Sequence, residues 1–108
     1  MYKQKEIRAP NRDRVLECIF RNPGISRKDT SDLTGITSAT ITAVVGELLR
    51  EGILTELGRM EEDRGTIGRA RIALNICPDY RYAVGVEFNY SSITGVVCDL
   101  RGGVKYQK

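Results

Sequence analysis

The sequence contains no histidine, and its three cysteines, Cys18, Cys77 and Cys98, stand far apart. They are odd in number and form no Cys-x-x-Cys pair, so neither a zinc site nor a disulfide framework is indicated. We therefore expect no bound metal, no cofactor and three buried, reduced thiols.

Long apolar runs are missing as well. No stretch approaches the roughly 18 consecutive apolar residues that a membrane helix needs, and the first ten residues, MYKQKEIRAP, contain no apolar signal-peptide region. Charged residues make up 29% and hydrophobic residues 41% of the 108 residues, which is typical of a folded domain. We expect a cytoplasmic protein with no membrane partner, consisting of one small domain or one domain with an appendage.

The net charge of +3 is distributed unevenly along the chain. Residues 1–28 hold eight lysines and arginines against three acidic residues, residues 29–63 hold two against eight, and residues 64–108 hold seven against three. Two basic ends around an acidic middle suggest a polyanionic partner that is touched at two places. The net charge alone is weak support for such a partner.

Start and stop signals predict a first helix near the N-terminus. Proline suits the first helical position and asparagine suits a cap, so we expect the helix to begin at Pro10 or Asn11 and to end at the NPG sequence of residues 22–24. Its buried stripe would consist of four apolar residues: Val15, Leu16, Ile19 and Phe20.

Two further helices should follow, separated by about three residues. The second is short, with Ser26 as its N-cap, Asp29 at the third helical position and Gly35 as its C-cap. Thr37 should cap the third helix, which runs to about Glu51.

The third helix has two contrasting faces. Apolar residues recur on one face with the 3.6-residue period of a helix: Ile41, Val44, Val45 and Leu48. The opposite face is small and carries no charge: Ala39, Thr42, Ala43 and Gly46. Because a helix face in water usually carries lysine or glutamate, we expect another molecule to lie against this one.

After Gly52 the hydrophobic period changes to that of strands. Residues 53–58 and 71–76 are predicted to form a β-hairpin, joined by the polar loop of residues 59–70. Three helices and such a hairpin make a winged helix-turn-helix of the α+β class, in which the second helix of the turn lies in the DNA major groove. A face of small residues lets that helix approach closely, while hydroxyl and methyl groups contact base edges. The alternative is that the same face packs against another protein.

The sequence resembles ROK-family transcriptional regulators over residues 11–104. The most specific segments are ISR, LTGIT and LLREGIL in the helical part, the GR pair of residues 68–69, and YAVGVE at residues 82–87. The resemblance implies an operator-binding winged helix at residues 1–78, with residues 38–51 as its recognition helix. Residues 79–108 would be the first strands of a sugar-kinase-like domain, at about 82–90, 93–100 and 104–107.

The resemblance further implies a repressor of sugar-metabolism genes that dimerises and responds to a sugar through the rest of that domain. Leucine is common in the family where Thr30 stands, so we expect Leu33 to carry most of the burial of the second helix. The sequence EFNYSS at residues 87–92 lacks the glycines of the family's phosphate-binding turn. We therefore expect no kinase activity and no other enzymatic activity.

Candidate DNA contacts follow from these positions. Arg27 and Lys28 occupy the first turn of the second helix, where N–H groups and the helix dipole favour a phosphate. They could equally be solvated. Arg69 follows Gly68 and could enter a minor groove, or it could pair with an acidic residue of the same loop. The complete set of candidates is Arg27, Lys28, Thr37, Ser38, Ala39, Thr40, Thr42, Ala43, Arg64, Arg69 and Arg71.

A second hypothesis makes the chain a protein-interaction module without DNA binding. The small face of the third helix and the apolar strands after residue 80 would then form an interface between copies of the chain. Because a ribbon of two or three strands is marginal alone and leaves unpaired edges, we expect homo-oligomerisation through residues 80–108 under either hypothesis.

The minor-groove role of Arg69 predicts a dependence on flanking sequence. A narrow A·T-rich minor groove concentrates negative potential and attracts arginine. Arg69→Ala should therefore weaken binding more on sites with A·T-rich flanks than on sites with G·C flanks. Titration of both duplexes measures this difference, and equal losses would reduce Arg69 to a phosphate contact.

Overall fold

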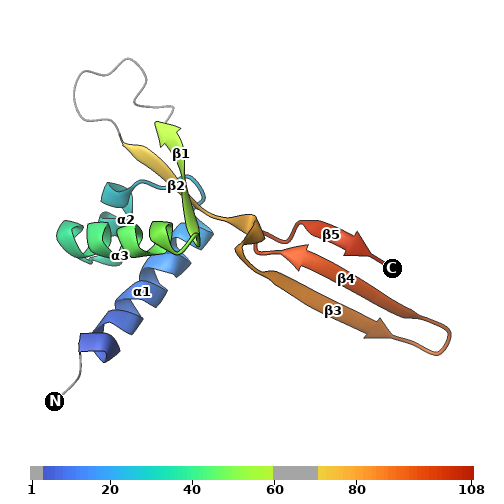
Figure 1. The fold of residues 1–108 in the computed structure, drawn as a ribbon. Helices are drawn as coiled ribbons and strands as arrows, with labels where there is room; N and C mark the ends of the chain where they lie inside the picture. Colours follow the sequence, from blue (N-terminus) through green and yellow to red (C-terminus); the bar gives the residue numbers. More distant parts are fainter. Residues whose placement is uncertain (1–3, 60–70) are drawn as a thin grey trace. The chain divides into compact units, whose positions relative to one another are not determined.

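The computed structural model of the chain describes residues 4–59 and 71–108. The elements follow in the order α1 (Gln4–Arg21), α2 (Arg27–Thr34), α3 (Ser38–Arg50), β1 (Leu54–Arg59), β2 (Ile72–Ile76), the short 3-10 helix η2 (Pro78–Tyr80), β3 (Tyr82–Phe88), β4 (Ile93–Asp99) and β5 (Val104–Gln107) (Figure 1). The chain divides into two compact units, Met1–Ile76 and Cys77–Lys108. The predicted fold class, a winged helix-turn-helix followed by a short antiparallel ribbon, is confirmed.

The first unit packs three helices beside a two-stranded antiparallel sheet. β1 and β2 pair from Leu54 opposite Ile76 to Arg59 opposite Ile72, with a register shift between Glu56 and Gly58. The core takes side chains from every one of these elements and from the turns between them. Its fully or almost fully buried apolar residues are Val15, Ile19, Ile25, Ile36, Ile41, Val44, Val45, Leu48, Leu54, Leu74 and Ile76.

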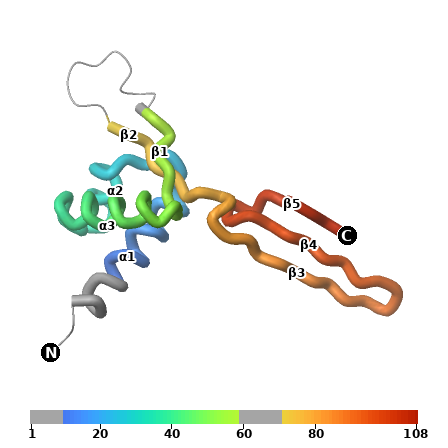
Figure 2. The backbone as a smooth tube through the Cα atoms, viewed as in Figure 1, coloured from blue at the N-terminus to red at the C-terminus, as the bar shows by residue number. Residues whose placement is uncertain are grey.

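A backbone bridge ties the turn before α2 to the hairpin. The N–H of Gly24 donates to the carbonyl of Leu74 at 2.8 Å, and the N–H of Leu74 donates to the carbonyl of Ile25 at 2.9 Å. Figure 2 lets the reader follow the chain from this turn, through α2 and α3, into β1. The base of the hairpin is thus attached to the helices by main-chain bonds as well as by the core.

The helix caps lie where the sequence predicts them. The Ser26 hydroxyl accepts the N–H of Asp29 at 3.1 Å, and Thr37 caps α3 through the N–H of Thr40. Gly35 ends α2 with φ +74°, a left-handed conformation that glycine adopts without steric cost. Three residues, 35–37, separate the two helices, which is the spacing of a helix-turn-helix.

The predicted start and stripe of α1 are wrong in two respects. The helix begins at Gln4, and Pro10 lies inside it. Proline removes one backbone hydrogen bond, but its fixed φ is compatible with a helix. A proline can therefore occupy the first position of a helix, but a helix can also begin before it. Phe20 is 47% exposed, whereas Val15 and Ile19 are buried. Because residues 15 and 19 already occupy one line on the helix, the next position turns away from the core.

The expected anchor of α2 is also wrong. Leu33 is 65% exposed, whereas Thr30 is completely buried. The Thr30 hydroxyl donates to the Ser26 carbonyl at 2.7 Å, so this polar group enters the core with its hydrogen bond satisfied. A β-branched threonine therefore fills the site between the helices, and Leu33 faces away from it.

The three cysteines are half-buried free thiols rather than fully buried ones. Burial raises the pKa of the Cys18 thiol, and the side chain of Asn22 opposes this shift. Cys18 lies in α1 and Cys98 in β4, whereas Cys77 lies between β2 and η2.

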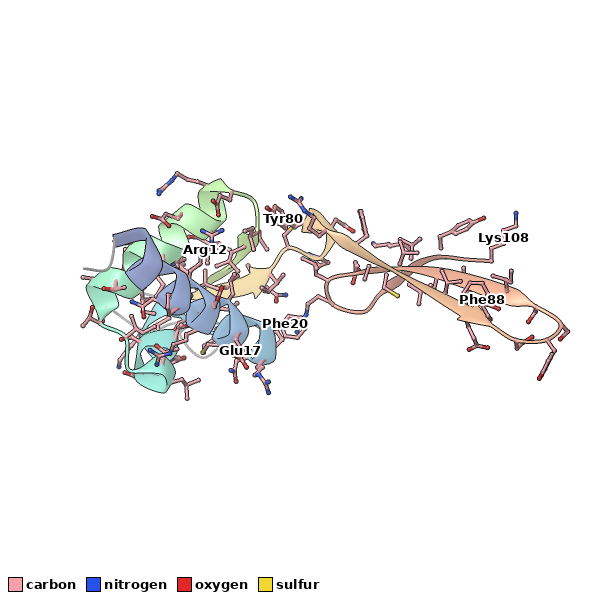
Figure 3. The ribbon with its side chains drawn as sticks, turned by 90° about the horizontal axis from the view of Figure 1, so that it is seen from below. Arg12, Glu17, Phe20, Tyr80, Phe88 and Lys108 are labelled. Carbon is pink, nitrogen blue, oxygen red and sulfur yellow. The ribbon has the colours of Figure 1, made fainter. Side chains whose placement is uncertain are left out.

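The second unit is an antiparallel sheet with the strand order β3-β4-β5. β3 pairs with β4 from Tyr82 opposite Asp99 to Phe88 opposite Ile93. β3 is exposed along its whole length, with Phe88 73% exposed (labelled in Figure 3). The sequence placed Tyr90 in this strand, but β3 ends at Phe88 and Tyr90 lies in the following turn.

Polar contacts fix the ends of this sheet. The Tyr82 hydroxyl donates to Asp79 at 3.1 Å, which raises the pKa of Tyr82, and Lys105 lies 3.3 Å from the same carboxylate. Backbone N–H groups of Gly103 and Arg101 donate to Asp99 and lower its pKa.

In the part of the chain that the structure describes, no helix has the length and apolar character needed to cross a membrane.

The observed packing of α2 and α3 predicts that two leucine substitutions have unequal effects on stability. Leu48→Ala creates a cavity at a completely buried position and should lower the free energy of unfolding by about 2–5 kcal/mol. Leu33→Ser removes a largely exposed side chain and should change it by less than about 0.5 kcal/mol. Urea denaturation measures both values, and a larger loss for Leu33→Ser would contradict the observed packing of α2.

Candidate nucleic-acid interface

Several of the candidate contact residues meet at one hollow in the surface of the first unit. Its walls come from the start of α2, the exposed face of α3 and the start of β2, and it encloses about 530 Å³. The hollow is lined by Ser26, Arg27, Lys28, Ser38, Thr42, Arg71 and Ile72, and we call it the α2–α3–β2 groove. Five of the candidate DNA contacts are therefore neighbours, although they come from three parts of the chain: Arg27, Lys28, Ser38, Thr42 and Arg71.

The face of α3 beside this groove has the character that the sequence predicts. Ser38, Ala39, Thr42 and Ala43 are exposed, whereas the opposite stripe of Ile41, Val44, Val45 and Leu48 is buried in the core. Burial of that stripe fixes the rotation of α3 about its axis. The small side chains consequently face outward, where a helix backbone can come close to a partner surface.

Thr37 and Thr40 have a local structural role at the start of α3. The Thr37 hydroxyl accepts the N–H of Thr40 at 3.4 Å and donates to the Thr40 hydroxyl at 3.0 Å. These contacts shape the entry of the helix, and neither residue lines the groove.

Arg27 forms an ion pair rather than being surrounded by solvent alone. Its guanidinium donates to the carboxylate of Glu56 on β1 at 2.9 Å, and both side chains are partly exposed. This ion pair spans from the first turn of α2 to the hairpin. It holds the arginine at the rim of the α2–α3–β2 groove.

Arg71 has a comparable partner. Its guanidinium lies 3.7 Å from the carboxylate of Asp29, so a second ion pair joins the first turn of α2 to the hairpin. The sequence suggested acidic residues of the wing loop as alternative partners for the wing arginines. The acidic residues of that loop lie outside the described residues; the partner Asp29 comes from α2, and no local spacing signal could have identified it.

The other basic residues near these elements fall into three groups. Lys28 is exposed and lines the groove next to Arg27. Arg64 and Arg69 lie outside the described residues. Arg12 and Arg14 connect α1 to the ends of the other helices: Arg12 (labelled in Figure 3) pairs with Glu51, the C-cap residue of α3, and the guanidinium of Arg14 donates to the carbonyl of Thr34 at the end of α2.

This arrangement suits a polyanion that also has polar edges. Two guanidiniums and one ammonium surround the groove, and the first turn of α2 adds the positive end of a helix dipole. Hydroxyls of Ser38 and Thr42 lie at its wall. Within residues 4–59 and 71–108, no group of three or more cysteine, aspartate or glutamate side chains is placed to hold a metal ion.

Comparisons with known proteins agree with this geometry. Residues 10–55 match a family described as winged helix-turn-helix DNA-binding. The xylose repressors of Bacillus subtilis and Staphylococcus xylosus are 28% and 31% identical over 94% and 77% of this chain. This chain is thus similar to xylose repressors over most of its own length. The uncharacterized protein y4fQ of Sinorhizobium fredii is 36% identical over 87% of it.

A solved structure shows the same fold. It is a ROK family transcriptional regulator described as a homolog of the E. coli MLC protein, with a TM-score of 0.67 and 22% identity over 94% of this chain. The chain covers 25% of that structure and 21–26% of the length of the curated relatives. The resemblance to ROK regulators that the sequence indicates is confirmed by these matches.

Proposed function

We propose that residues 1–78 are the sequence-specific DNA-binding module of a transcriptional regulator that represses sugar-metabolism genes. The observation that carries this proposal is the α2–α3–β2 groove, where cations and hydroxyls converge beside a helix face without charge. The match to winged helix-turn-helix DNA-binding domains supports the same conclusion. No enzymatic step is part of the proposal.

In this proposal α3 enters the major groove along its exposed face. Small side chains let the helix approach the floor of the groove, where the Ser38 and Thr42 hydroxyls bond base edges. Methyl groups of Ala39 and Ala43 contact thymine methyls. Because no arginine or lysine occupies this part of α3, the readout uses methyl and hydroxyl contacts rather than arginine–guanine pairs.

Basic residues around the groove position the module on the DNA backbone. Lys28 and Arg27 contact one phosphate region together with the N–H groups at the start of α2, and Arg71 contacts the backbone from the hairpin. The wing arginines Arg64 and Arg69 reach the adjacent minor groove. These contacts carry little sequence information but make binding dependent on salt.

Residues 79–108 begin a further domain in this proposal, through which a sugar effector acts on the cytoplasmic regulator. The exposed apolar residues of β3, including Val84 and Phe88, support association between copies of the chain. Two copies would present two winged helices to the two halves of a palindromic operator.

Ala43→Glu tests the proposal directly. It places a carboxylate on the exposed face of α3, where it would meet the DNA, without altering the buried stripe. Binding to a duplex selected by the wild-type chain from a randomised pool should weaken by roughly a hundredfold or more, because like charges are brought together at an interface. Fluorescence anisotropy of labelled duplex measures the affinity.

Leu33→Glu is the matched control. It adds the same charge at an exposed position of α2 that lines a separate hollow near residues 22–25. The control should alter affinity far less than Ala43→Glu, and both variants should melt close to the wild-type temperature. Unchanged binding by Ala43→Glu would remove α3 from the interface and favour the protein-interaction alternative.

Lys28→Ala tests the phosphate contacts separately. Loss of one phosphate contact should reduce the magnitude of the slope of log affinity against log salt by about 1 and weaken all duplexes to a similar extent. Titrations of the selected and a scrambled duplex between 50 and 200 mM salt, roughly the range over which such effects are large, measure both quantities. An effect confined to the selected duplex would instead assign Lys28 to base readout.

A further inference from the structure

Both groove arginines of known position are held by carboxylates from another element. Arg27 of α2 pairs with Glu56 of β1 at 2.9 Å, and Arg71, directly before β2, lies 3.7 Å from Asp29 of α2. Both ion pairs join α2 to the hairpin. In one pair α2 provides the cation, and in the other it provides the anion. Two of the cations that surround the groove are therefore partly neutralised within the chain.

These pairs are not needed to attach the hairpin to the helices. The backbone bonds between Leu74 and residues 24 and 25 already do so, and Leu54, Leu74 and Ile76 are buried in the core. Partly exposed ion pairs contribute little to stability, because solvent screening and side-chain ordering offset most of their attraction. Their main effect thus concerns the arginines themselves.

We propose that Glu56 and Asp29 compete with DNA phosphate for Arg27 and Arg71 and thereby lower the affinity of the α2–α3–β2 groove for any duplex. This inference rests on the proposed function. A phosphate that approaches Arg27 must take guanidinium donors from Glu56 or accept a position next to its negative charge. In the first case the attraction between arginine and phosphate is offset by the loss of the Arg27–Glu56 ion pair. In the second case it is offset by repulsion between the phosphate and the Glu56 carboxylate.

The competition has a simple chemical basis. Carboxylate and phosphate use the same planar fork of guanidinium N–H groups, so they are alternative ligands of one side chain. Arg27 remains partly exposed in its ion pair, which leaves it accessible to exchange. Glu56 is likewise partly exposed, so a neutral residue of the same shape can replace it without leaving a buried group unsatisfied.

Glu56→Gln is therefore the informative variant, because Asp29 also lies in the capped first turn of α2, where its charge favours the helix. With a random-sequence duplex as the probe, Glu56→Gln should bind about two- to fivefold more tightly than the wild-type 108-residue chain, the range set by the usual strength of a partly exposed ion pair. Fluorescence anisotropy at constant salt measures the change.

A double-mutant cycle with Arg27→Ala identifies the cause. If Glu56 acts by occupying Arg27, then Glu56→Gln should no longer tighten binding in the Arg27→Ala background. Glu17→Gln is the charge-matched control, since Glu17 pairs with Arg21 along α1 (Glu17 is labelled in Figure 3) and does not line the groove. This control should leave affinity within about 1.5-fold, the low end of exposed ion-pair effects.

The outcomes separate this inference from the function beneath it. Unchanged or weaker binding by Glu56→Gln overturns the competition, as does tightening that persists without Arg27 or that Glu17→Gln reproduces. If the wild-type chain shows no salt-dependent binding to any duplex, the proposed function fails and the competition fails with it. Normal wild-type binding combined with a contrary cycle overturns only the competition.

Discussion

Burial of one stripe of α3 is the constraint on which the rest of the first unit depends. Ile41, Val44, Val45 and Leu48 fill the space between the other helices and the hairpin. Because side chains on a helix are fixed in angular order, burying this stripe turns the small, uncharged side outward. The same packing sets α3 beside the start of α2 and β2. The groove and its lining residues follow from that arrangement.

The α2–α3–β2 groove carries cations that attract a polyanion, and two of these cations are paired with carboxylates of the same chain. Apolar packing and backbone bonds fix the positions of α2 and the hairpin, which carry the groove arginines. Each arginine is paired with a carboxylate of the other element: Arg27 of α2 with Glu56 of the hairpin, and Arg71 of the hairpin with Asp29 of α2. A surface with unpaired cations would bind any polyanion through charge alone. Under the proposed competition, pairing the arginines within the chain shifts the balance of DNA binding toward contacts made by the face of α3, where shape and base chemistry matter.

Local signals in the sequence predicted the caps, the turn and the strands well, because each depends on a few adjacent residues. Ser26 and Gly35 act through their own backbone geometry and can be recognised without tertiary context. The roles of Thr30 and Leu33 could not be ranked, because hydrophobicity does not reveal which side of a short helix meets the core. The partners of Arg27 and Arg71 were missed because only the folded topology brings them together.

The bridge between Ile25 and Leu74 has a consequence for how the first unit folds. It joins two segments separated in the sequence by α2, α3 and the whole of β1, so it is a long-range contact of the kind that slows folding in general. The similarity to the winged helix-turn-helix family ends at residue 55, yet the turn before α2 finds its backbone partners beyond that boundary. The backbone network that holds this turn is therefore longer than the recognisable motif, and closing it costs the entropy of a long chain loop.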